Sequence, residues 1–328
     1  ICGSDIRYFK GENPWAKQTL GQELPNPPNI ILGHEFTGVV DSVHDSVDAP
    51  LIGKRVAVNT FITCGRCDYC RLGQENLCAA TKHLGHGQGW GEMDFYPGGM
   101  AELCPVSADQ VYELPDQVSD EEATFLDPMI AALHATDRGE PKLLDDVAIQ
   151  GAGPIGFLIG QMAKAYGERR TFISDLAPKN LGIARAVGFD DAVDAGTEMD
   201  ALFKAVMAAT GGAGVHVVYN TIGSQESIEE SLRMLRKGGT VVLLATKDKD
   251  IRFPSLLLSG ERTLKTSSNA TFSDFPRAME LLARGIVQVK PLISHRFPLS
   301  SALDAFRVAC NKSESGAVKV LLDCRCPS

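Results

Sequence analysis

The sequence predicts an α/β protein that combines a β-rich part with a doubly wound, mostly parallel sheet. Three observations lead to this prediction. Short apolar segments separated by Gly and Pro fill the chain up to about residue 120, which is typical of strands joined by loops. Strands and helices then alternate, and a glycine motif follows the first strand of that alternation. The 328 residues are enough for roughly two domains with sizeable cores.

The first part reads as short strands within residues 29–43 and 53–61. A further strand is predicted at Ala101–Val106, after an irregular Gly-rich stretch at residues 85–99. Few helical patterns occur before residue 120, so this part is expected to be β-rich with long loops. The composition of the Gly-rich stretch does not point to any class of substrate.

The second part opens with a predicted helix over residues 119–136, in which Ser119 and Glu122 have the spacing of a capping box. Predicted strands at 147–150, 170–174, 216–221 and 240–246 then alternate with predicted helices at 154–167, 178–188, 199–212 and 227–239. This alternation predicts a mostly parallel sheet with helices on both faces. From roughly residue 269 the pattern is mixed again, with helices at 275–285 and 300–311 and a last strand at 317–323.

A glycine motif marks a candidate dinucleotide site. The run GAGPIG matches G-x-G-x-x-G between a predicted strand and a predicted helix, and its cofactor-binding candidates are Gly151, Gly153, Pro154, Ile155 and Gly156. The first glycine permits a tight turn, the second lets the backbone approach a pyrophosphate, and the third lets helix and strand pack closely. The pyrophosphate would lie at the helix N-terminus, where free N–H groups attract anions. A doubly wound domain that binds nothing, or a different nucleotide, is the alternative.

Asp175 ends the strand that follows, at the distance expected for an acid that binds the ribose hydroxyls of adenosine. A carboxylate at this position repels the 2′-phosphate of NADP, so the sequence favours NAD. Lys179, rather than an Arg, stands four residues further on and is also a candidate cofactor-binding residue.

Four cysteines form the clearest metal motif of the chain. Cys64, Cys67, Cys70 and Cys78 lie in the run TCGRCDYCRLGQENLC, with the pattern C-x2-C-x2-C-x7-C. Thiolates spaced this closely can converge on one tetrahedral zinc ion, and four protein ligands leave no open position. The motif therefore predicts a closed, structural zinc site, and two local disulfides or unrelated thiols are the alternatives.

Three further fragments each carry little information alone: Cys2-Gly3-Ser4-Asp5, Gly33-His34-Glu35 and Asp127-Pro128. A lone Cys or His usually serves packing, and Asp-Pro usually forms a turn. Beside a closed zinc motif and a dinucleotide motif, they indicate an open metal site with mixed sulfur, nitrogen and oxygen ligands. A catalytic zinc has this arrangement, with three protein ligands and one position for water or substrate.

In these residues the chain resembles the zinc-dependent medium-chain alcohol dehydrogenases, in particular their sorbitol and threonine dehydrogenase-like branch. The resemblance covers essentially the whole chain, in the order ICGSD, ILGHEFTGVV, the four-cysteine lobe, GAGPIG with Asp175, and KGGTVVLLA. It implies a GroES-like catalytic domain at residues 1–127 and 269–328, with a structural zinc lobe at about residues 60–80. It also implies a Rossmann domain at residues 128–268 and a homodimer or homotetramer.

The resemblance also implies a ligand set for the mixed metal site. Cys2 and His34 would bind the catalytic zinc, and Glu35 would be a ligand or an exchangeable one. Asp127 would be a further ligand. Its position is occupied by Cys in the liver-type enzymes and by an acidic residue in the polyol and threonine branches. At this position the chain resembles the polyol and threonine branches.

The implied chemistry assigns Ser4 to hydrogen-bond the alcohol and take its proton, and Asp5 to orient a zinc ligand. Zinc is a Lewis acid that lowers the pKa of an alcohol, and the resulting alkoxide passes a hydride to the nicotinamide. Arg7 occupies a position that holds His in many relatives. An Arg is a poor proton shuttle because it stays charged, so a pyrophosphate or surface contact is its alternative role.

The predicted function is thus the NAD-dependent oxidation of a secondary alcohol to a ketone. The predicted cofactors are NAD and two zinc ions per chain, one catalytic and one structural. A polyol, sugar or sugar-derived alcohol is the expected substrate. An L-threonine 3-dehydrogenase-like activity is the alternative among enzymes, and a zinc-stabilised, non-catalytic binding protein is the alternative outside them.

Composition argues against other classes of function. The net charge is 32 − 41 = −9 without a basic stripe, which argues against nucleic-acid binding. No apolar run approaches the ~20 residues needed to cross a bilayer. Nine cysteines with four in one tight cluster fit a reducing compartment, so a cytoplasmic location is expected. The chain begins at Ile1 inside a motif, so an upstream segment is expected and targeting is not judged from this end.

Overall fold

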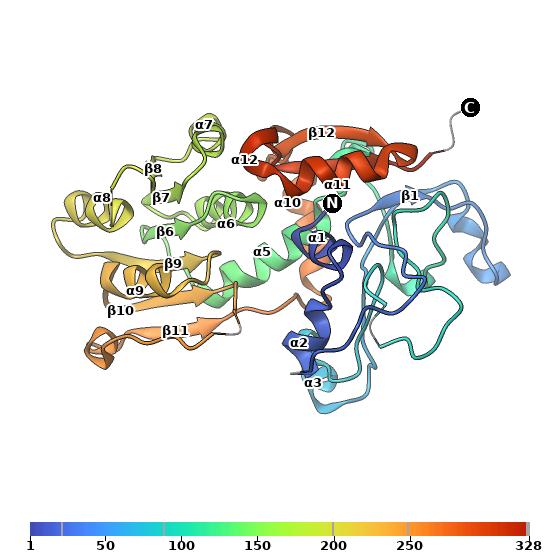
Figure 1. The fold of residues 1–328 in the computed structure, drawn as a ribbon, viewed down its shortest axis with the longest axis horizontal. Helices are drawn as coiled ribbons and strands as arrows, with labels where there is room; N and C mark the ends of the chain where they lie inside the picture. Colours follow the sequence, from blue (N-terminus) through green and yellow to red (C-terminus); the bar gives the residue numbers. More distant parts are fainter. Residues whose placement is uncertain (21, 88, 199, 248, 326–328) are drawn as a thin grey trace. The chain divides into compact units, whose positions relative to one another are not determined.

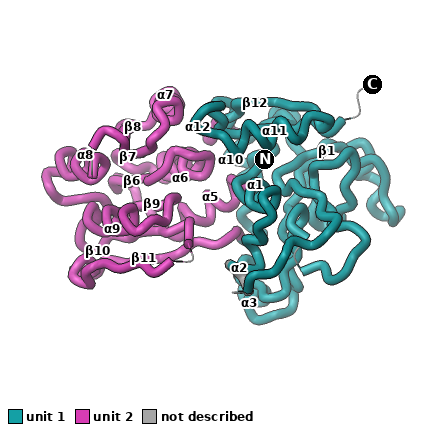
Figure 2. Tube along the Cα trace, viewed as in Figure 1, with its two compact units in different colours: residues 1–127, 271–283, 289–328 teal, residues 128–270, 284–288 magenta. Residues whose placement is uncertain are grey.

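The computed structural model describes residues 1–20, 22–87, 89–198, 200–247 and 249–325, and the chain divides into two compact units (Figure 2). Unit 1 comprises Ile1–Asp127, Thr271–Ala283 and Val289–Ser328. Unit 2 comprises Pro128–Ala270 and Arg284–Gln288. The chain therefore leaves unit 1 after Asp127, returns to it at Thr271 and adds one more short segment, Arg284–Gln288, to unit 2.

Unit 2 is built on a six-stranded sheet (Figure 1). Its strands are β6 (Asp146–Gln150), β7 (Arg170–Asp175), β8 (Asp191–Asp194), β9 (Val215–Asn220), β10 (Leu235–Leu243) and β11 (Thr263–Thr266). Their order is β11-β10-β9-β6-β7-β8, and every neighbouring pair is parallel. The first strand, β6, thus lies mid-sheet beside β9, at the switch point where ligands of such sheets bind.

Helices precede and connect these strands: α5 (Leu126–Gly139), α6 (Pro154–Ala165), α7 (Pro178–Ala186), α8 (Ala201–Ala209) and α9 (Gln225–Met234). Helix α6 packs on β6 and β7, and α9 packs on β9 and β10. All positions of β6 are buried, as expected for a strand covered on both faces. Residue 199, the predicted start of the helix that became α8, lies outside the described residues.

The single helix predicted over residues 119–136 is wrong, because the structure has two helices there. Helix α4 (Asp120–Ala123) starts at the predicted capping box, in which Ser119 Oγ accepts a hydrogen bond from the Glu122 N–H. Helix α5 starts only after a break. Pro128 explains the break, because a proline ring clashes with the carbonyl four residues before it and prevents a continuous helix.

The helix predicted at residues 227–239 also ends early, because α9 stops at Met234 and the chain continues directly as β10. The new strand pairs with β9 at Leu235, and a register shift precedes its regular pairing from Thr240. Gly238 has φ of 73° within this irregular stretch, a conformation that glycine adopts without strain. Gly238 and Gly239, the last two residues of the predicted helix, therefore belong to a bulged strand.

Unit 1 contains short strands. Strands β1 (Thr37–Val39), β2 (Arg55–Val58) and β5 (Val111–Glu113) form an antiparallel sheet, β3 (Phe61–Ile62) pairs with β4 (Lys82–His83), and β12 (Ile293–Pro298) pairs in parallel with β13 (Lys319–Asp323). Helices of the C-terminal part are α10 (Asp274–Ala283), α11 (Ala302–Cys310) and α12 (Lys312–Ser315). The strand predicted at Ala101–Val106 is not formed. Pro105 lies inside that segment and has no N–H for a strand ladder.

The sequence did not predict the helices of the first 80 residues: α1 (Gly3–Phe9), α2 (Pro14–Leu20) and α3 (Asp68–Arg71). Helix α1 begins at Cys2, whose backbone N–H donates a hydrogen bond to Asp5 Oδ2 at 2.8 Å, as in a capping box. Cysteine is not a usual N-cap residue, so this helix start gave no clear signal.

The α/β class with a doubly wound parallel sheet, predicted from the sequence, is confirmed. The α-helices of the described residues range in length from 4 residues, as in α3, to the 14 residues of α5. None of the helices in this described part has both the length and the apolar composition that crossing a membrane requires.

Candidate functional site

Helix α1 brings three polar side chains to one site. Ser4 and Tyr8 are four residues apart and therefore lie on the same face of the helix. Asp5 is only 1% exposed, and its Oδ2 accepts the hydrogen bond from the Cys2 N–H. Its other oxygen, Oδ1, lies 3.3 Å from Nδ1 of His34. The start of the helix thus places Cys2 and Asp5 beside the same histidine.

Tight backbone packing fixes the segment that leads into His34. Gly33 has φ of 97°, and its carbonyl accepts a hydrogen bond from the Gly99 N–H at 2.7 Å. A Cβ on Gly85 would lie 2.4 Å from the Gly33 carbonyl oxygen, so no larger residue fits at Gly85 without moving the backbone. The chain before His34 is therefore held between two glycine-containing segments.

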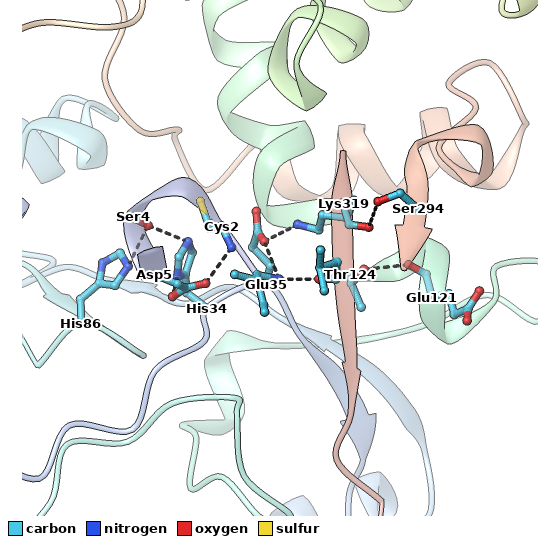
Figure 3. Close-up of polar contacts among 12 residues, drawn as sticks. Cys2, Ser4, Asp5, His34, Glu35, His86, Glu121, Thr124, Ser294 and Lys319 are labelled. Atoms are coloured by element: carbon cyan, nitrogen blue, oxygen red, sulfur yellow. Dashed lines mark hydrogen bonds and ion pairs between the residues drawn. The ribbon is translucent and has the colours of Figure 1, made fainter. Parts of the chain in front are cut away.

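Cys2, His34 and Glu35 form a group in which one ligand atom of each lies within 4.8 Å of the others. Figure 3 shows them beside Ser4, whose Oγ lies 3.4 Å from Nε2 of His34. Nδ1 of His34 faces Asp5 at ion-pair distance, in a contact that does not meet hydrogen-bond geometry. With Nδ1 directed at a carboxylate, Nε2 is the nitrogen that can bind a metal.

Lys319, on strand β13, forms a buried ion pair with Glu35, and the two side chains are 3% and 6% exposed. Nζ of Lys319 also lies 5.1 Å from the centroid of the Phe125 ring. Burial alone would raise the pKa of Glu35, but the neighbouring positive charges, that of Lys319 foremost and that of His34 among them, together outweigh burial and the pKa lies below its ordinary value. Glu35 is thus held as a charged carboxylate.

Asp127 is not part of this group of described residues. It lies in the first turn of α5, and its Oδ1 accepts a hydrogen bond from the Thr60 hydroxyl at 3.1 Å. Burial raises the pKa of Asp127 to about 6, opposed by the charge of His34 and reinforced by Glu35. These influences show a carboxylate near the group, and its role as a zinc ligand stays a prediction.

Two further histidines lie against His34. The ring centroid of His86 is 4.3 Å from that of His34 and 4.3 Å from that of His83. Tyr8 stacks on His86 at 4.9 Å, and Nε2 of His86 lies 3.4 Å from Ser4 Oγ. Burial lowers the pKa of His83 to about 3 and that of His86 well below its ordinary value, so both rings are neutral.

The charges around His34 favour a cation at this place. Burial opposes a charge on His34, but Asp5 and Cys2 outweigh it and raise its pKa well above the ordinary value. Burial likewise would raise the pKa of Asp5, but the charge of His34 lowers it below its ordinary range. A site that stabilises positive charge and presents sulfur, nitrogen and oxygen donors together fits a zinc ion with mixed ligands.

The four predicted cysteines form a second group, with all four sulfurs within 4.8 Å of one another. The N–H of Cys64 donates to Sγ of Cys78 at 3.4 Å, and the N–H of Cys67 donates to Sγ of Cys64 at 3.3 Å. The N–H groups of Arg66 and Cys67 lower the pKa of the Cys64 thiol to about 6, whereas burial raises that of Cys70 to about 11. The four thiols cannot all ionise without a compensating cation, and a tetrahedral zinc fits this need.

The glycine motif lies between β6 and α6, as predicted. Gly151 has φ of 99°, and a Cβ on Gly156 would lie 1.9 Å from the Gly151 carbonyl oxygen. A Cβ on Gly153 would meet nothing within 4 Å, so the backbone is open on this side. Gly153 is the N-cap of α6 and Pro154 follows at its first position, so the unpaired N–H groups of the helix begin here. An anion is stabilised at such a helix N-terminus.

Asp175 ends β7 beside the motif. Its Oδ2 accepts a hydrogen bond from the Ala152 N–H and its Oδ1 accepts one from the Ala177 N–H, both at 2.8 Å. The carboxylate is thus fixed against the glycine loop, where the ribose of a dinucleotide is expected. Lys179 is exposed in the first turn of α7.

Sequence reasoning missed Lys319, His83 and His86. Single Lys and His residues occur along the whole chain, and no spacing connects these three to the ligand motifs. The available signal for His86 was the glycine on each side of it, Gly85 and Gly87, with φ of 78° and 65°. A turn of this kind presents the one side chain between its glycines.

Comparison with known proteins covers both parts of the chain. Residues 1–116 match the family model for the alcohol dehydrogenase GroES-like domain, and residues 154–284 match the model for zinc-binding dehydrogenases. D-arabitol-phosphate dehydrogenase of Enterococcus avium is 33% identical over 98% of this chain and 87% of its own length. The chain belongs to the zinc-dependent medium-chain alcohol dehydrogenase family.

Other dehydrogenases are similar over the same extent. Sorbitol dehydrogenase of Bacillus subtilis is 29% identical over 94% of this chain and 83% of its own length. L-threonine 3-dehydrogenase of Anaeromyxobacter sp. is 31% identical over 98% of this chain and 88% of its own length. A short chain alcohol dehydrogenase of Escherichia coli CFT073, complexed with NADH, has a TM-score of 0.84 at 27% identity, covering 98% and 88% of the two chains. A zinc-binding dehydrogenase of Sinorhizobium meliloti, bound to NADP, has a TM-score of 0.83 at 29% identity, with the same coverage of 98% and 88%.

This medium-chain dehydrogenase therefore has the predicted combination of a GroES-like part and a Rossmann sheet. It is an oxidoreductase that acts on CH–OH groups, and the predicted cofactors, NAD and zinc, are those of the family. The roles of the individual site residues stay predictions.

Proposed function

We propose that this enzyme oxidises a secondary alcohol of a polyol, sugar or sugar-derived alcohol to the ketone, with NAD as hydride acceptor. One observation carries the proposal: Cys2, His34 and Glu35 converge within 4.8 Å beside the hydroxyl of Ser4. A mixed-ligand metal group next to a hydroxyl that can accept a proton has the parts that oxidation of an alcohol requires.

The residues of the mixed group have distinct roles in this proposal. Cys2 and His34 would hold the catalytic zinc, with Glu35 or Asp127 completing the set. Zinc supplies Lewis acidity, which lowers the pKa of an alcohol. Asp5 faces Nδ1 of His34, which fixes the ring and leaves Nε2 available as a ligand.

Ser4 is the proposed proton acceptor. Its hydroxyl can accept a hydrogen bond from the alcohol and, because Ser4 is partly exposed, donate another to water, so the proton can pass from the alcohol oxygen through Oγ to water. Arg7, which replaces the His of many relatives, pairs with Glu12 at 2.7 Å on the surface. The surface contact, its alternative role from the sequence, is therefore the one we propose for Arg7.

The glycine loop and Asp175 would bind NAD, which accepts the hydride. Because Asp175 is fixed by two backbone N–H groups, its charge stands where a 2′-phosphate would be repelled, and NAD is preferred over NADP. In Asp175→Ser we expect the NAD/NADP ratio of kcat/KM to fall by about tenfold or more, as expected for the loss of one nearby charge. Asp175→Asn keeps the shape of the side chain and removes its charge, so the NAD/NADP ratio of kcat/KM should fall in this variant as well. A ratio unchanged in both variants would remove the ribose assignment.

Two relatives support polyol chemistry, because by name they act on a sugar alcohol or its phosphate. The L-threonine alternative is not favoured, although one relative is an L-threonine 3-dehydrogenase. An amino acid substrate presents a carboxylate and an ammonium group that need charged partners. His86, which faces Ser4, is a neutral ring instead.

The test is a screen of NAD reduction with polyols, polyol phosphates, aldose sugars, inositols, simple secondary alcohols and L-threonine. We expect the highest kcat/KM with a polyol or a sugar-derived alcohol. A highest value with L-threonine would contradict the proposed substrate class. Absence of NADH formation with every alcohol would contradict the proposed reaction.

We also propose a homo-oligomer, either a dimer or a tetramer, and a cytoplasmic location. All eight cysteines of the described residues are free thiols, which supports a reducing compartment. Light scattering should give twice or four times the chain mass of 35.2 kDa. A mass equal to that of one chain would contradict the oligomer.

A further inference from the structure

His86 has no part in the reaction described above, yet its surroundings hold it firmly. Gly85 and Gly87 turn the chain on either side of it. The rings of Tyr8 and His83 stack on the His86 ring, with interplanar angles of 28° and 16°. The His34 ring also meets the His86 ring, in a T-shaped contact with a centroid separation of 4.3 Å. Stacking leaves the ring edge, with its nitrogens, as the part that can meet a ligand.

That edge is directed at the proposed proton acceptor. Nε2 of His86 lies 3.4 Å from Oγ of Ser4, and the same oxygen lies 3.4 Å from Nε2 of His34 (Figure 3). Ser4 therefore has a proposed metal ligand on one side and His86 on the other. When Nε2 of His34 is used as a ligand, it is no longer a hydrogen-bond partner for Ser4, and His86 is the remaining contact.

Two polar atoms at this separation suit two neighbouring hydroxyl groups. Hydroxyl oxygens on adjacent carbons of a polyol lie at a similar distance from each other. Ser4 would bond the reacting hydroxyl, and Nε2 of His86 would bond the next one. An imidazole nitrogen is a donor or an acceptor according to its tautomer, and a hydroxyl can pair with either. With a simple secondary alcohol, Nε2 keeps only its 3.4 Å contact with Ser4 Oγ. The hydrogen bond to a second hydroxyl is then missing, which weakens binding.

We propose that His86 is a specificity-determining residue, which recognises the hydroxyl adjacent to the reacting carbon and selects vicinal diols over simple secondary alcohols. This inference rests on the polyol function proposed above. It names the feature of the substrate that the site recognises, the hydroxyl next to the reacting carbon.

The first experiment compares two probes, 2,3-butanediol, which has a neighbouring hydroxyl, and 2-butanol, which lacks it. His86→Phe keeps a ring between Tyr8 and His83 and removes both nitrogens. We expect kcat/KM for 2,3-butanediol to fall about tenfold more than kcat/KM for 2-butanol, the effect of one lost hydrogen bond. The matched control is His44→Phe at an exposed position outside the site, which should leave both values at the wild-type level.

A second pair of variants locates the nitrogen. The amide of Gln extends about as far as Nε2 of His, whereas the shorter Asn reaches only the position of Nδ1. His86→Gln should therefore keep the preference for the diol, and His86→Asn should lose it. Calorimetry gives a readout without turnover: the Kd of 2,3-butanediol for the enzyme with NADH should weaken in the Phe and Asn variants and change least in the Gln variant.

Equal losses for the two probes in His86→Phe would overturn the role of His86, and so would identical behaviour of the Gln and Asn variants. Either result leaves the polyol function intact, because wild-type turnover is measured in the same experiment. Failure of the wild-type enzyme to oxidise any polyol would instead remove the proposed function. If His86→Phe does not fold, the Gln and Asn pair still decides the question.

Discussion

The two candidate metal-binding groups of unit 1 differ in how the chain brings their donor atoms together. The four cysteines lie within residues 64–78, and three of them are partly exposed. The mixed group draws Cys2 and His34 from separate segments, and the ion pair of Glu35 comes from Lys319 on β13. Local spacing is therefore enough to specify a closed site. A reactive site needs tertiary structure that holds several charges away from water, where they act strongly on one another.

The largest expected effect on activity comes from removing a ligand of the mixed group. In Cys2→Ser or His34→Ala we expect kcat/KM to fall about 1000-fold or more, because a Lewis acid supplies several kcal/mol of transition-state stabilisation. Metal analysis should show the loss of about one zinc per chain, while far-UV circular dichroism stays close to that of the wild type. Full activity in either variant would show that this group is not the catalytic centre.

The cysteine group should give the opposite pattern. In Cys67→Ser we expect the free energy of unfolding to fall by about 4 kcal/mol or more, the range seen when a structural metal is lost. Chemical denaturation measures this change, and kcat/KM of the folded fraction should change little. Cys310→Ser, outside both groups, is the matched control. An unaltered denaturation midpoint in Cys67→Ser would argue against a structural ion.

The buried ion pair gives a third contrast, because the cysteine group contains no such pair among the described residues. Lys319→Met leaves the carboxylate of Glu35 buried without its partner, which should lower the free energy of unfolding by about 3–5 kcal/mol. The double variant Glu35→Gln with Lys319→Met should recover most of this loss. Urea denaturation of the wild type, Lys319→Met, Glu35→Gln and the double variant closes the cycle, and additive single effects would show that the two residues do not interact.

The same pair predicts a pH dependence. The pKa of Glu35 is lower in the folded protein than its ordinary value of 4.5, so its contribution to stability is fully present above that pH. The contribution is lost as the pH falls through the lowered pKa. The difference between the wild type and Lys319→Met, measured on metal-free protein, should therefore be largest near neutral pH and shrink in acid. A constant difference would mean that Glu35 is not the group involved.

The smallest expected effect comes from the residue that orients His34. Asp5→Asn keeps an oxygen that can accept from the Cys2 N–H and removes the charge that faces His34. We expect zinc affinity of the mixed group to fall about 10- to 100-fold, as is usual for such outer partners. Competition with a chelator measures this value, with the affinity of the cysteine group as internal reference. Equal affinities in variant and wild type would deny Asp5 this role.

The parallel sheet of unit 2 was predictable because its signal is repetitive. Alternating strands and helices, with a glycine motif after the first strand, specify the topology without knowledge of distant contacts. The two errors have local causes: Pro128 divides one predicted helix, and the chain after Met234 enters a strand directly. In unit 1, by contrast, helix α1 begins at a cysteine that a reader of the sequence assigns to metal binding alone.

Short motifs named candidates that the fold does bring together, as for the four cysteines and for Cys2 with His34, and their roles as ligands stay predictions. The site was not predictable where one residue meets it through the fold alone. Lys319 reaches Glu35 from a position 284 residues away, and the His86 ring meets Tyr8 and His34 from two other segments. Such contacts depend on the packing of the folded chain, and a single His or Lys in a sequence does not predict them.

The distance between Glu35 and Lys319 along the chain, 284 residues, bears on the order in which the protein matures. A polypeptide leaves the ribosome from its N-terminus, so the cysteine loop can take up its ion soon after residue 78 emerges. The partner of Glu35, Lys319, is translated much later. Until then, burial of the Glu35 carboxylate without a partner is strongly unfavourable. We therefore expect the group of Cys2, His34 and Glu35 to assemble only after β13 has been translated, later than the group of four cysteines.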